Sequence, residues 1–178
     1  MSEWESFYVI VGSSGGALIG LQFVVITLIA DRRALATRDS LSAFGTPTVV
    51  HLTVALIVSA IMSAPWRSFL SVSLVLMACG IGGLTYGIVV ILRARRQTSY
   101  TPVLQDWIWY VLLPCSVYAV LTIAGVFFRG DPQDSEFVIA STALALLLIG
   151  IHNAWDTVTH IVMSRSEGED SESGDSSG

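Results

Sequence analysis

Two histidines, an aspartate and an asparagine stand within the nine residues HNAWDTVTH, which directly follow the apolar run ALALLLIGI. On a helix, His152, Asp156 and His160 share one face because residues four apart lie one turn apart, and Asn153 lies beside them. Imidazole nitrogens and a carboxylate bind divalent transition metals, and the same groups relay protons. The types and spacing of these residues therefore point to ion or proton chemistry.

The depth of this stretch in a membrane separates two interpretations of it. Counted from Phe137 at about 1.5 Å per residue, His152 lies about 22 Å along a helix and Asp156 about 28 Å. Only His152 is then well inside a hydrocarbon core of about 30 Å. The alternative interpretation is that the stretch marks where a helix leaves the membrane, with Trp155 as an interfacial anchor.

Other apolar segments are expected to bring polar groups to the depth of His152. Gln22 lies about 22 Å from the outer end of the first segment, and His51 about 7 Å from the inner end of the second. Pro114 lacks an N–H group, which leaves the carbonyl of Tyr110 without its helical donor near the same level. Because polar groups in lipid face the bundle interior or water, we predict one polar layer in the cytoplasmic half of the membrane. The candidate residues of an ion or proton path are Gln22, His51, His152, Asn153 and Asp156, and the candidate metal ligands are His51, His152 and Asp156.

The composition of the chain defines the elements that must position these groups. Of the 178 residues 53% are hydrophobic and 13% are charged, and that charged share is about half the usual one for soluble domains. A span of the hydrocarbon core takes about 20 residues of helix. We therefore expect an all-α integral membrane protein with a bundle of five transmembrane helices. The expected spans are 7–30, 46–64, 69–92, 107–128 and 137–157, with Pro47 in the first turn of the second.

The arginines predict the orientation of this bundle. The chain has no lysine, and seven of its nine arginines fall in the first connector, the third connector and the tail, against two in the other connectors. Cytoplasmic segments carry the excess of basic residues, so we expect the N-terminus outside and the C-terminus in the cytoplasm. The start MSEWES lacks the basic region of a signal peptide, so the first span is expected to be retained. A multi-pass protein of the cell membrane, of the prokaryotic inner-membrane type, is the expected location.

The tail SRSEGEDSESGDSSG carries five of the fourteen acidic residues and one arginine. Low hydrophobicity and like charge predict that residues 164–178 are disordered, after a five-helix transmembrane domain at 1–163. The tail is either a solvated end or a docking segment for a basic partner. The arginines are few and placed as topology signals, so the expected partners are the lipid bilayer and other proteins, and no nucleic acid.

Glycines at four-residue spacing predict close helix packing. Gly12, Gly16 and Gly20 form GxxxGxxxG, a glycine-zipper pattern, on the first span, and Gly83 and Gly87 repeat the spacing on the third. Small side chains on one face let two backbones approach closely. We expect the first and third spans to pack against each other, and a homo-oligomer formed through the first span is the alternative.

The chain contains no GxGxxG, P-loop, HExxH or paired-carboxylate motif, so we expect no enzyme and no cofactor. Its five residues HNAWD resemble the HNxxD pattern on one helix of the Zrt/Irt-like metal transporters, with His152, Asn153 and Asp156 at the matching positions. That family has eight spans and a second helix with a His/Glu motif, and neither is found in this sequence. The chain is therefore assigned to no family.

Three functions remain open from the sequence. The first is an oligomeric ion or proton channel or transporter that uses the polar layer, and we favour it. The second is a non-catalytic membrane assembly or interaction protein, in which the polar layer only holds helices together. The third is a membrane redox subunit with a haem held by His51 and His152 as axial ligands.

Overall fold

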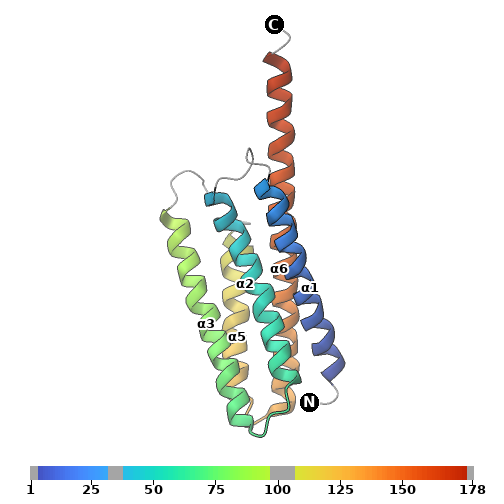
Figure 1. Cartoon of the computed structure of the whole chain (residues 1–178). Helices are drawn as coiled ribbons and strands as arrows, with labels where there is room; N and C mark the ends of the chain where they lie inside the picture. Colours follow the sequence, from blue (N-terminus) through green and yellow to red (C-terminus); the bar gives the residue numbers. More distant parts are fainter. Residues whose placement is uncertain (1–3, 32–37, 97–106, 176–178) are drawn as a thin grey trace.

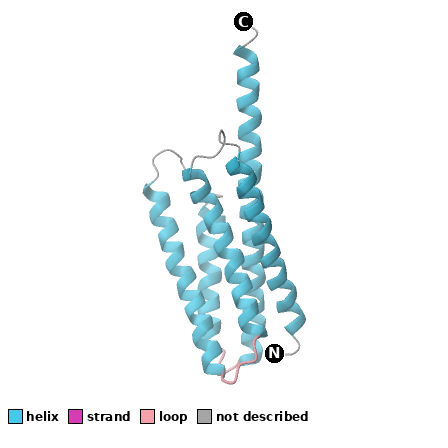
Figure 2. Cartoon of the chain, in the orientation of Figure 1, coloured by secondary structure: helices cyan, strands magenta, loops and turns pink. Residues whose placement is uncertain are grey.

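The computed structural model describes residues 4–31, 38–96 and 107–175, and the elements in these ranges are all helices (Figures 1 and 2). Successive long helices run in opposite directions, so the first and last helices begin at the same end of the bundle (Figure 1). The elements are α1 (Glu5–Asp31), α2 (Arg38–Ser63), α3 (Phe69–Arg96), the π-helical turn η2 (Ile108–Leu112), α5 (Leu113–Phe127) and α6 (Pro132–Asp175).

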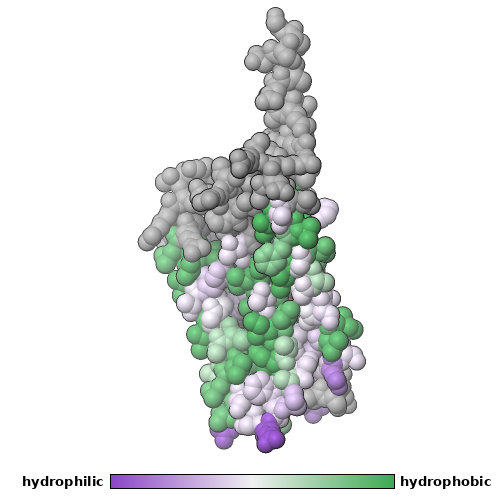
Figure 3. All heavy atoms as spheres, viewed as in Figure 1, coloured by the Kyte–Doolittle hydropathy of each residue, from purple (hydrophilic) through white to green (hydrophobic). Residues whose placement is uncertain are grey.

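Five apolar stretches of these helices are long enough to cross a membrane, which confirms the predicted number of apolar helices. Apolar residues cover much of the visible side of the bundle, and hydrophilic residues gather at the end where α6 begins (Figure 3). This distribution suits a helix bundle whose sides face lipid. The stretches are Glu5–Thr27, Thr46–Ser63, Phe69–Leu92, Ile108–Phe127 and Pro132–Thr159.

Four helices surround the interior, and α1 lies outside them. α2 packs against α1 and α6, and α5 packs against α3 and α6, while α2 and α3 make a smaller contact. In the most apolar 18-residue window of each span, 50% of the residues are buried in α2 and α6, against 28% in α5, 22% in α3 and 17% in α1. The interior therefore lies between α2, α3, α5 and α6, and α1 covers the outer side of α2 and α6.

The N-terminal end of α1 is attached to the start of α6. The Tyr8 hydroxyl donates a hydrogen bond of 3.2 Å to the backbone carbonyl of Glu136. The Trp4 ring packs edge-on against Phe137, with 6.0 Å between the ring centroids. These contacts fix α1 at the end of the bundle that carries the short α2–α3 turn.

Most of the interior is filled by branched apolar side chains. Val58, Leu76, Leu121 and Leu146 are fully buried and come from four different helices. In a bilayer the alternative to this core is lipid rather than water, so close packing stabilises the fold more than removal from water does. The fit between helices is therefore decided by small residues at their contacts.

The glycines of α1 contact α2, so the prediction that the first and third spans pack together is wrong. A Cβ atom added to Gly12 would lie 3.0 Å from the Cβ atom of Ser59, and one added to Gly16 would lie 3.3 Å from a methyl group of Leu56. No described atom lies within 4 Å of such a Cβ atom on Gly20. Two members of the predicted zipper therefore pack within the chain, and the third does not.

The glycines of α3 contact α5 instead. A Cβ atom on Gly83 would overlap the Tyr118 ring, and one on Gly87 would lie 2.6 Å from the Cys115 sulfur. On Gly80 it would lie 2.9 Å from the Tyr118 carbonyl oxygen. Among the helix pairs that these glycines join, α3 and α5 thus lie closest together, and the Tyr118 ring packs directly against the α3 backbone.

The second helix begins earlier than predicted. The sequence placed its start at Thr46 with Pro47 in the first turn, whereas α2 begins at Arg38 and holds Pro47 inside. The apolar span still begins at Thr46, so about two helical turns precede it. Proline costs one backbone hydrogen bond at such a position without ending the helix.

The last helix also differs from its prediction. α6 runs to Asp175 and projects beyond the other helices (Figure 1), whereas the sequence predicted disorder from residue 164. A helix that already exists extends at the gain of one hydrogen bond for each residue, without a new nucleation cost. The backbone of α6 can therefore continue past the end of the bundle.

Candidate functional site

Asn153 is the most deeply buried polar residue of α6. It is 0% exposed, and neither its Oδ1 nor its Nδ2 atom has a hydrogen-bond partner among the described residues. A buried amide left unsatisfied costs about 1–3 kcal/mol. Native proteins contain few such groups, and each calls for an explanation such as a bound molecule.

His51 of α2 is a second buried polar group, and it is 2% exposed. Its Nδ1 atom lies 2.8 Å from the hydroxyl oxygen of Tyr118 on α5. Its Nε2 atom has no partner in the described part of the chain. We assign the Tyr118 hydroxyl as donor to Nδ1, because its hydrogen then has an acceptor and the neutral ring carries its own hydrogen on Nε2.

Asn153 and His51 lie at nearly the same height in the bundle. α6 and α2 touch where a Cβ atom on Gly150 would lie 2.6 Å from a methyl carbon of Leu52. Asn153 is three residues further along α6, and His51 precedes Leu52 on the antiparallel α2. At about 1.5 Å per residue, the two polar residues differ in height by about 3 Å. Asn153, His51 and Tyr118 form the polar layer of the structure, which is a different set of residues from the layer predicted from the sequence.

His152 has different neighbours from His51. Its ring stacks on Trp109 of η2, with ring centroids 3.6 Å apart and an angle of 5° between the planes. The side chain is half-buried, and its Nδ1 atom has no hydrogen-bond partner among the described residues. His51 instead contacts Tyr118, so the structure places the two histidines beside different aromatic side chains.

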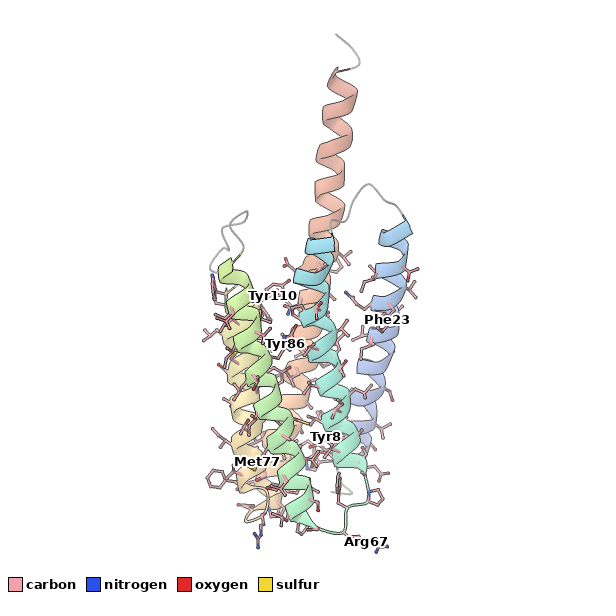
Figure 4. The ribbon with its side chains drawn as sticks, turned by 60° about the vertical axis from the view of Figure 1, so that its left-hand side comes forward. Tyr8, Phe23, Arg67, Met77, Tyr86 and Tyr110 are labelled. Atoms are coloured by element: carbon pink, nitrogen blue, oxygen red, sulfur yellow. The ribbon has the colours of Figure 1, made fainter. Side chains whose placement is uncertain are left out.

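Asp156 lies one turn beyond His152 and also contacts η2. Its Oδ2 atom accepts a hydrogen bond of 3.1 Å from the hydroxyl of Tyr110. Two successive residues of η2, Trp109 and Tyr110, therefore hold two residues of α6 that share a helix face. Tyr110 lies toward the end of the bundle opposite the turn that carries Arg67 (Figure 4).

The π-helical geometry of η2 has a cause in the sequence. The Leu113 N–H group donates to the Ile108 carbonyl, five residues back instead of four. Pro114 follows directly and has no N–H group of its own. The sequence predicted that this proline would free the Tyr110 carbonyl within an α-helix. In the five-residue register the carbonyl that faces the proline nitrogen is that of Trp109.

Gln22 does not join the polar layer. It is buried on α1, which lies outside the four helices around the interior. Gly15 of the same helix lies level with Leu52, since a Cβ atom on it would be 3.3 Å from the Leu52 carbonyl oxygen. Gln22 is seven residues further on, about 10 Å along the helix. Asn153 lies about 4.5 Å from the Leu52 level in the same direction, so Gln22 is about 6 Å from Asn153 in height, and it lies on a helix outside the interior.

The predicted metal ligands do not form one group. Among the described residues, no three histidine, cysteine, aspartate or glutamate side chains come together in a way that could hold a metal ion. His51, His152 and Asp156 all belong to the described part and are included in that statement. Sequence reasoning also missed Tyr118, because a buried tyrosine in an apolar helix gives no signal of its partner.

An apolar segment of the interior separates the polar layer from the end where α6 begins. Fully buried Val58, Leu121 and Leu146 fill it. The buried hydroxyl groups in this segment donate to backbone carbonyls, so they offer no free donor to a passing molecule. They are Ser59, which donates to Ala55, Ser73, which donates to Gly125, and Thr142, which donates to Ile139.

Comparison of the chain with known protein families, with curated proteins and with solved structures gives no match to any of them. The function is therefore argued from the chemistry of the polar layer itself.

Proposed function

We propose that the protein is a small membrane carrier that binds a polar substrate at the polar layer of Asn153, His51 and Tyr118. The observation that carries the proposal is Asn153, a 0% exposed amide with no partner among the described residues. A residue that only held helices together would use these hydrogen bonds on a neighbouring helix. Polar groups retained inside a membrane span normally mark a substrate or ion path.

The apolar segment favours a carrier over a continuous pore. Val58, Leu121 and Leu146 fill the interior between the layer and the end where α6 begins, and the buried hydroxyl groups there already donate to backbone carbonyls. Carriers bind their substrate near the middle of the membrane and open to one side at a time. In this proposal the present form is closed toward that end, and helix movement opens it.

The haem alternative is not favoured by the helix contacts. α2 and α6 touch directly at Gly150 and Leu52, next to His51 and close to His152. A porphyrin held between these two histidines as axial ligands would need the two helices apart at this level. His51 also uses Nδ1 toward Tyr118, and His152 stacks on Trp109.

The proposal places the polar layer in the cytoplasmic half of a prokaryotic inner membrane. We infer this orientation from the arginines, because seven of the nine fall in the first and third predicted connectors and the predicted tail, and basic residues are enriched on the cytoplasmic side. The N-terminus is then outside and the C-terminal end of α6 is in the cytoplasm. Asp156 and Tyr110 lie between the layer and the cytoplasm, on the side from which a substrate enters.

Flux through proteoliposomes tests the proposed function. The full-length protein is reconstituted, and uptake is measured for protons, potassium, zinc and small neutral solutes. We expect at least one species to cross faster than in protein-free vesicles. Asn153→Leu abolishes this flux, and Trp155→Leu retains it because Trp155 lies on the same helix but is 71% exposed. No flux of any species, or equal flux in both variants, contradicts the proposal.

A second candidate, an assembly protein, is favoured by the outer face of α1. Ser13, Ala17 and Gly20 are exposed there, and small residues let transmembrane helices of two subunits approach closely. Light scattering of the full-length protein in detergent tests this candidate. A homo-oligomer that Ala17→Leu dissociates supports it, and a wild-type monomer contradicts it.

A further inference from the structure

We infer that the polar layer binds a small neutral molecule that carries both a hydrogen-bond donor and an acceptor, such as an amide or an alcohol. The inference rests on the proposed carrier function and names its substrate class. Two residues on facing helices carry it, Asn153 of α6 and His51 of α2. Both are more than nine-tenths buried, and both keep hydrogen-bonding atoms that no described residue uses.

The unused atoms form a mixed set of donors and acceptors. Tyr118 donates to Nδ1 of His51, so Nε2 of the neutral ring is a donor. Asn153 offers Nδ2 as a donor and Oδ1 as an acceptor. An amide matches this set, because its oxygen accepts from Nε2 and Nδ2 while its N–H group donates to Oδ1. The hydroxyl group of an alcohol matches two of the three atoms, because it accepts from Nε2 and donates to Oδ1.

The residues of the polar layer carry no charge, and this favours a neutral substrate over an ion. Asn153, His51 and Tyr118 are all neutral in the assignment above. The nearest carboxylate along α6 is Asp156, one turn away, and it accepts a hydrogen bond from Tyr110. Burying an ion without an opposite charge is far more costly than burying a neutral polar molecule. A neutral substrate avoids that cost.

The close packing of the helices around the layer excludes a large substrate. Gly150 brings α6 directly against Leu52 of α2. On the other side, the Tyr118 ring lies so close to Gly83 that even a Cβ atom there would overlap it. A sugar cannot enter between helices packed in this way without separating them. Urea, acetamide and glycerol are therefore suitable probes, and sucrose is the size control.

Stopped-flow light scattering of proteoliposomes measures the solute permeability directly. Vesicles that hold the full-length protein are mixed with a hyperosmotic solution of one probe, and their re-swelling reports its entry. We expect urea, acetamide or glycerol to enter faster than in protein-free vesicles, and sucrose to enter at the same rate in both. Proton and potassium fluxes, followed with internal dyes, are expected to equal those of protein-free vesicles.

Two variants connect this permeability with the layer. Asn153→Leu removes both amide hydrogen-bonding atoms and keeps the branched shape of the side chain. His51→Phe retains a ring but removes the Nε2 donor together with the Nδ1 acceptor of the Tyr118 hydroxyl. Each is expected to lower the permeability of the transported probe by about tenfold or more, as the loss of a buried hydrogen bond requires. Trp155→Leu retains wild-type permeability. Circular dichroism shows which variant remains folded, and either one alone suffices for the comparison.

The outcomes separate this inference from the proposed function. If protons, potassium or zinc cross and the neutral probes do not, the carrier function stands and the inference is overturned. If water is the only neutral molecule whose permeability rises, the inference is overturned as well. If no species crosses, both fail. Entry of a neutral probe that the folded layer variants do not slow overturns the inference by placing the path elsewhere.

Discussion

At the scale of single residues, heights along the helices followed from the sequence only in part, and neighbours did not. Counting along the predicted helices placed His51 at the level of His152 and Gln22, and in the structure His51 differs by about 3 Å in height from Asn153, the residue next to His152. Counting does not define how each helix is rotated, so the partners Tyr118 and Trp109 were not predicted. It also grouped Gln22 with the layer, although its helix lies outside the interior. Side-chain direction depends on packing that one sequence does not display.

Asn153→Leu is expected to stabilise the substrate-free protein. Leucine has the same branched side-chain skeleton of four heavy atoms as asparagine, with methyl groups in place of the amide oxygen and nitrogen, and it brings no unsatisfied hydrogen-bonding atoms into the interior. Removal of the buried amide should therefore raise the free energy of unfolding by about 1–3 kcal/mol. Thermal melting in detergent measures the change, and exposed Trp155→Leu should stay within about 0.5 kcal/mol of wild type. A lower melting temperature for Asn153→Leu would mean that the amide has a structural partner.

At the scale of helices, hydropathy predicted the existence of the spans but not their neighbours. The apolar runs ended at charged or proline-containing connectors, so five spans could be located from the sequence alone. Lipid and protein core are equally apolar, so hydropathy does not tell which face meets another helix. The glycine spacing coincides with close contacts at Gly12, Gly16, Gly83 and Gly87 but not at Gly20, and the partner helices are α2 and α5.

Two neighbouring glycines of α3 provide a matched test of this packing. A methyl group at Gly83 would overlap the Tyr118 ring, whereas no described atom lies within 4 Å of a Cβ atom on Gly82. Gly83→Ala is expected to destabilise the fold by about 1–3 kcal/mol through overpacking. Gly82→Ala is expected to be neutral or to stabilise by up to about 1 kcal/mol, since alanine favours the helix. Similar melting temperatures for the two variants would place the α3–α5 contact elsewhere.

At the scale of the whole molecule, we expect the end of α6 to be independent of the bundle. It projects beyond the other helices (Figure 1), and its acidic residues lie at the C-terminal end of the helix, where negative charge is unfavourable. Deletion of residues 164–178 is therefore expected to leave the melting temperature of the bundle unchanged. Backbone amides of 164–175 should exchange with solvent within seconds, as frayed helix ends do. Slow exchange there, or a melting temperature lowered by the deletion, would show that this segment is packed.

We predict the orientation of the molecule from its odd number of apolar helices and its arginines. Arg67 and Arg129 lie in turns at the end where α6 begins, and the other seven arginines lie in or next to the sequence segments that join α1 to α2 and α3 to η2, or in the last part of α6. By the positive-inside rule, the end with two arginines faces outward. A fluorescent protein fused after Gly178 should therefore fold and fluoresce in the cytoplasm. In a chain without Cys79 and Cys115, a cysteine at exposed Gly130 should react with a membrane-impermeant maleimide added to intact cells. A dark fusion combined with an unreactive Gly130→Cys would invert the orientation, and the substrate would then reach the polar layer from the outside.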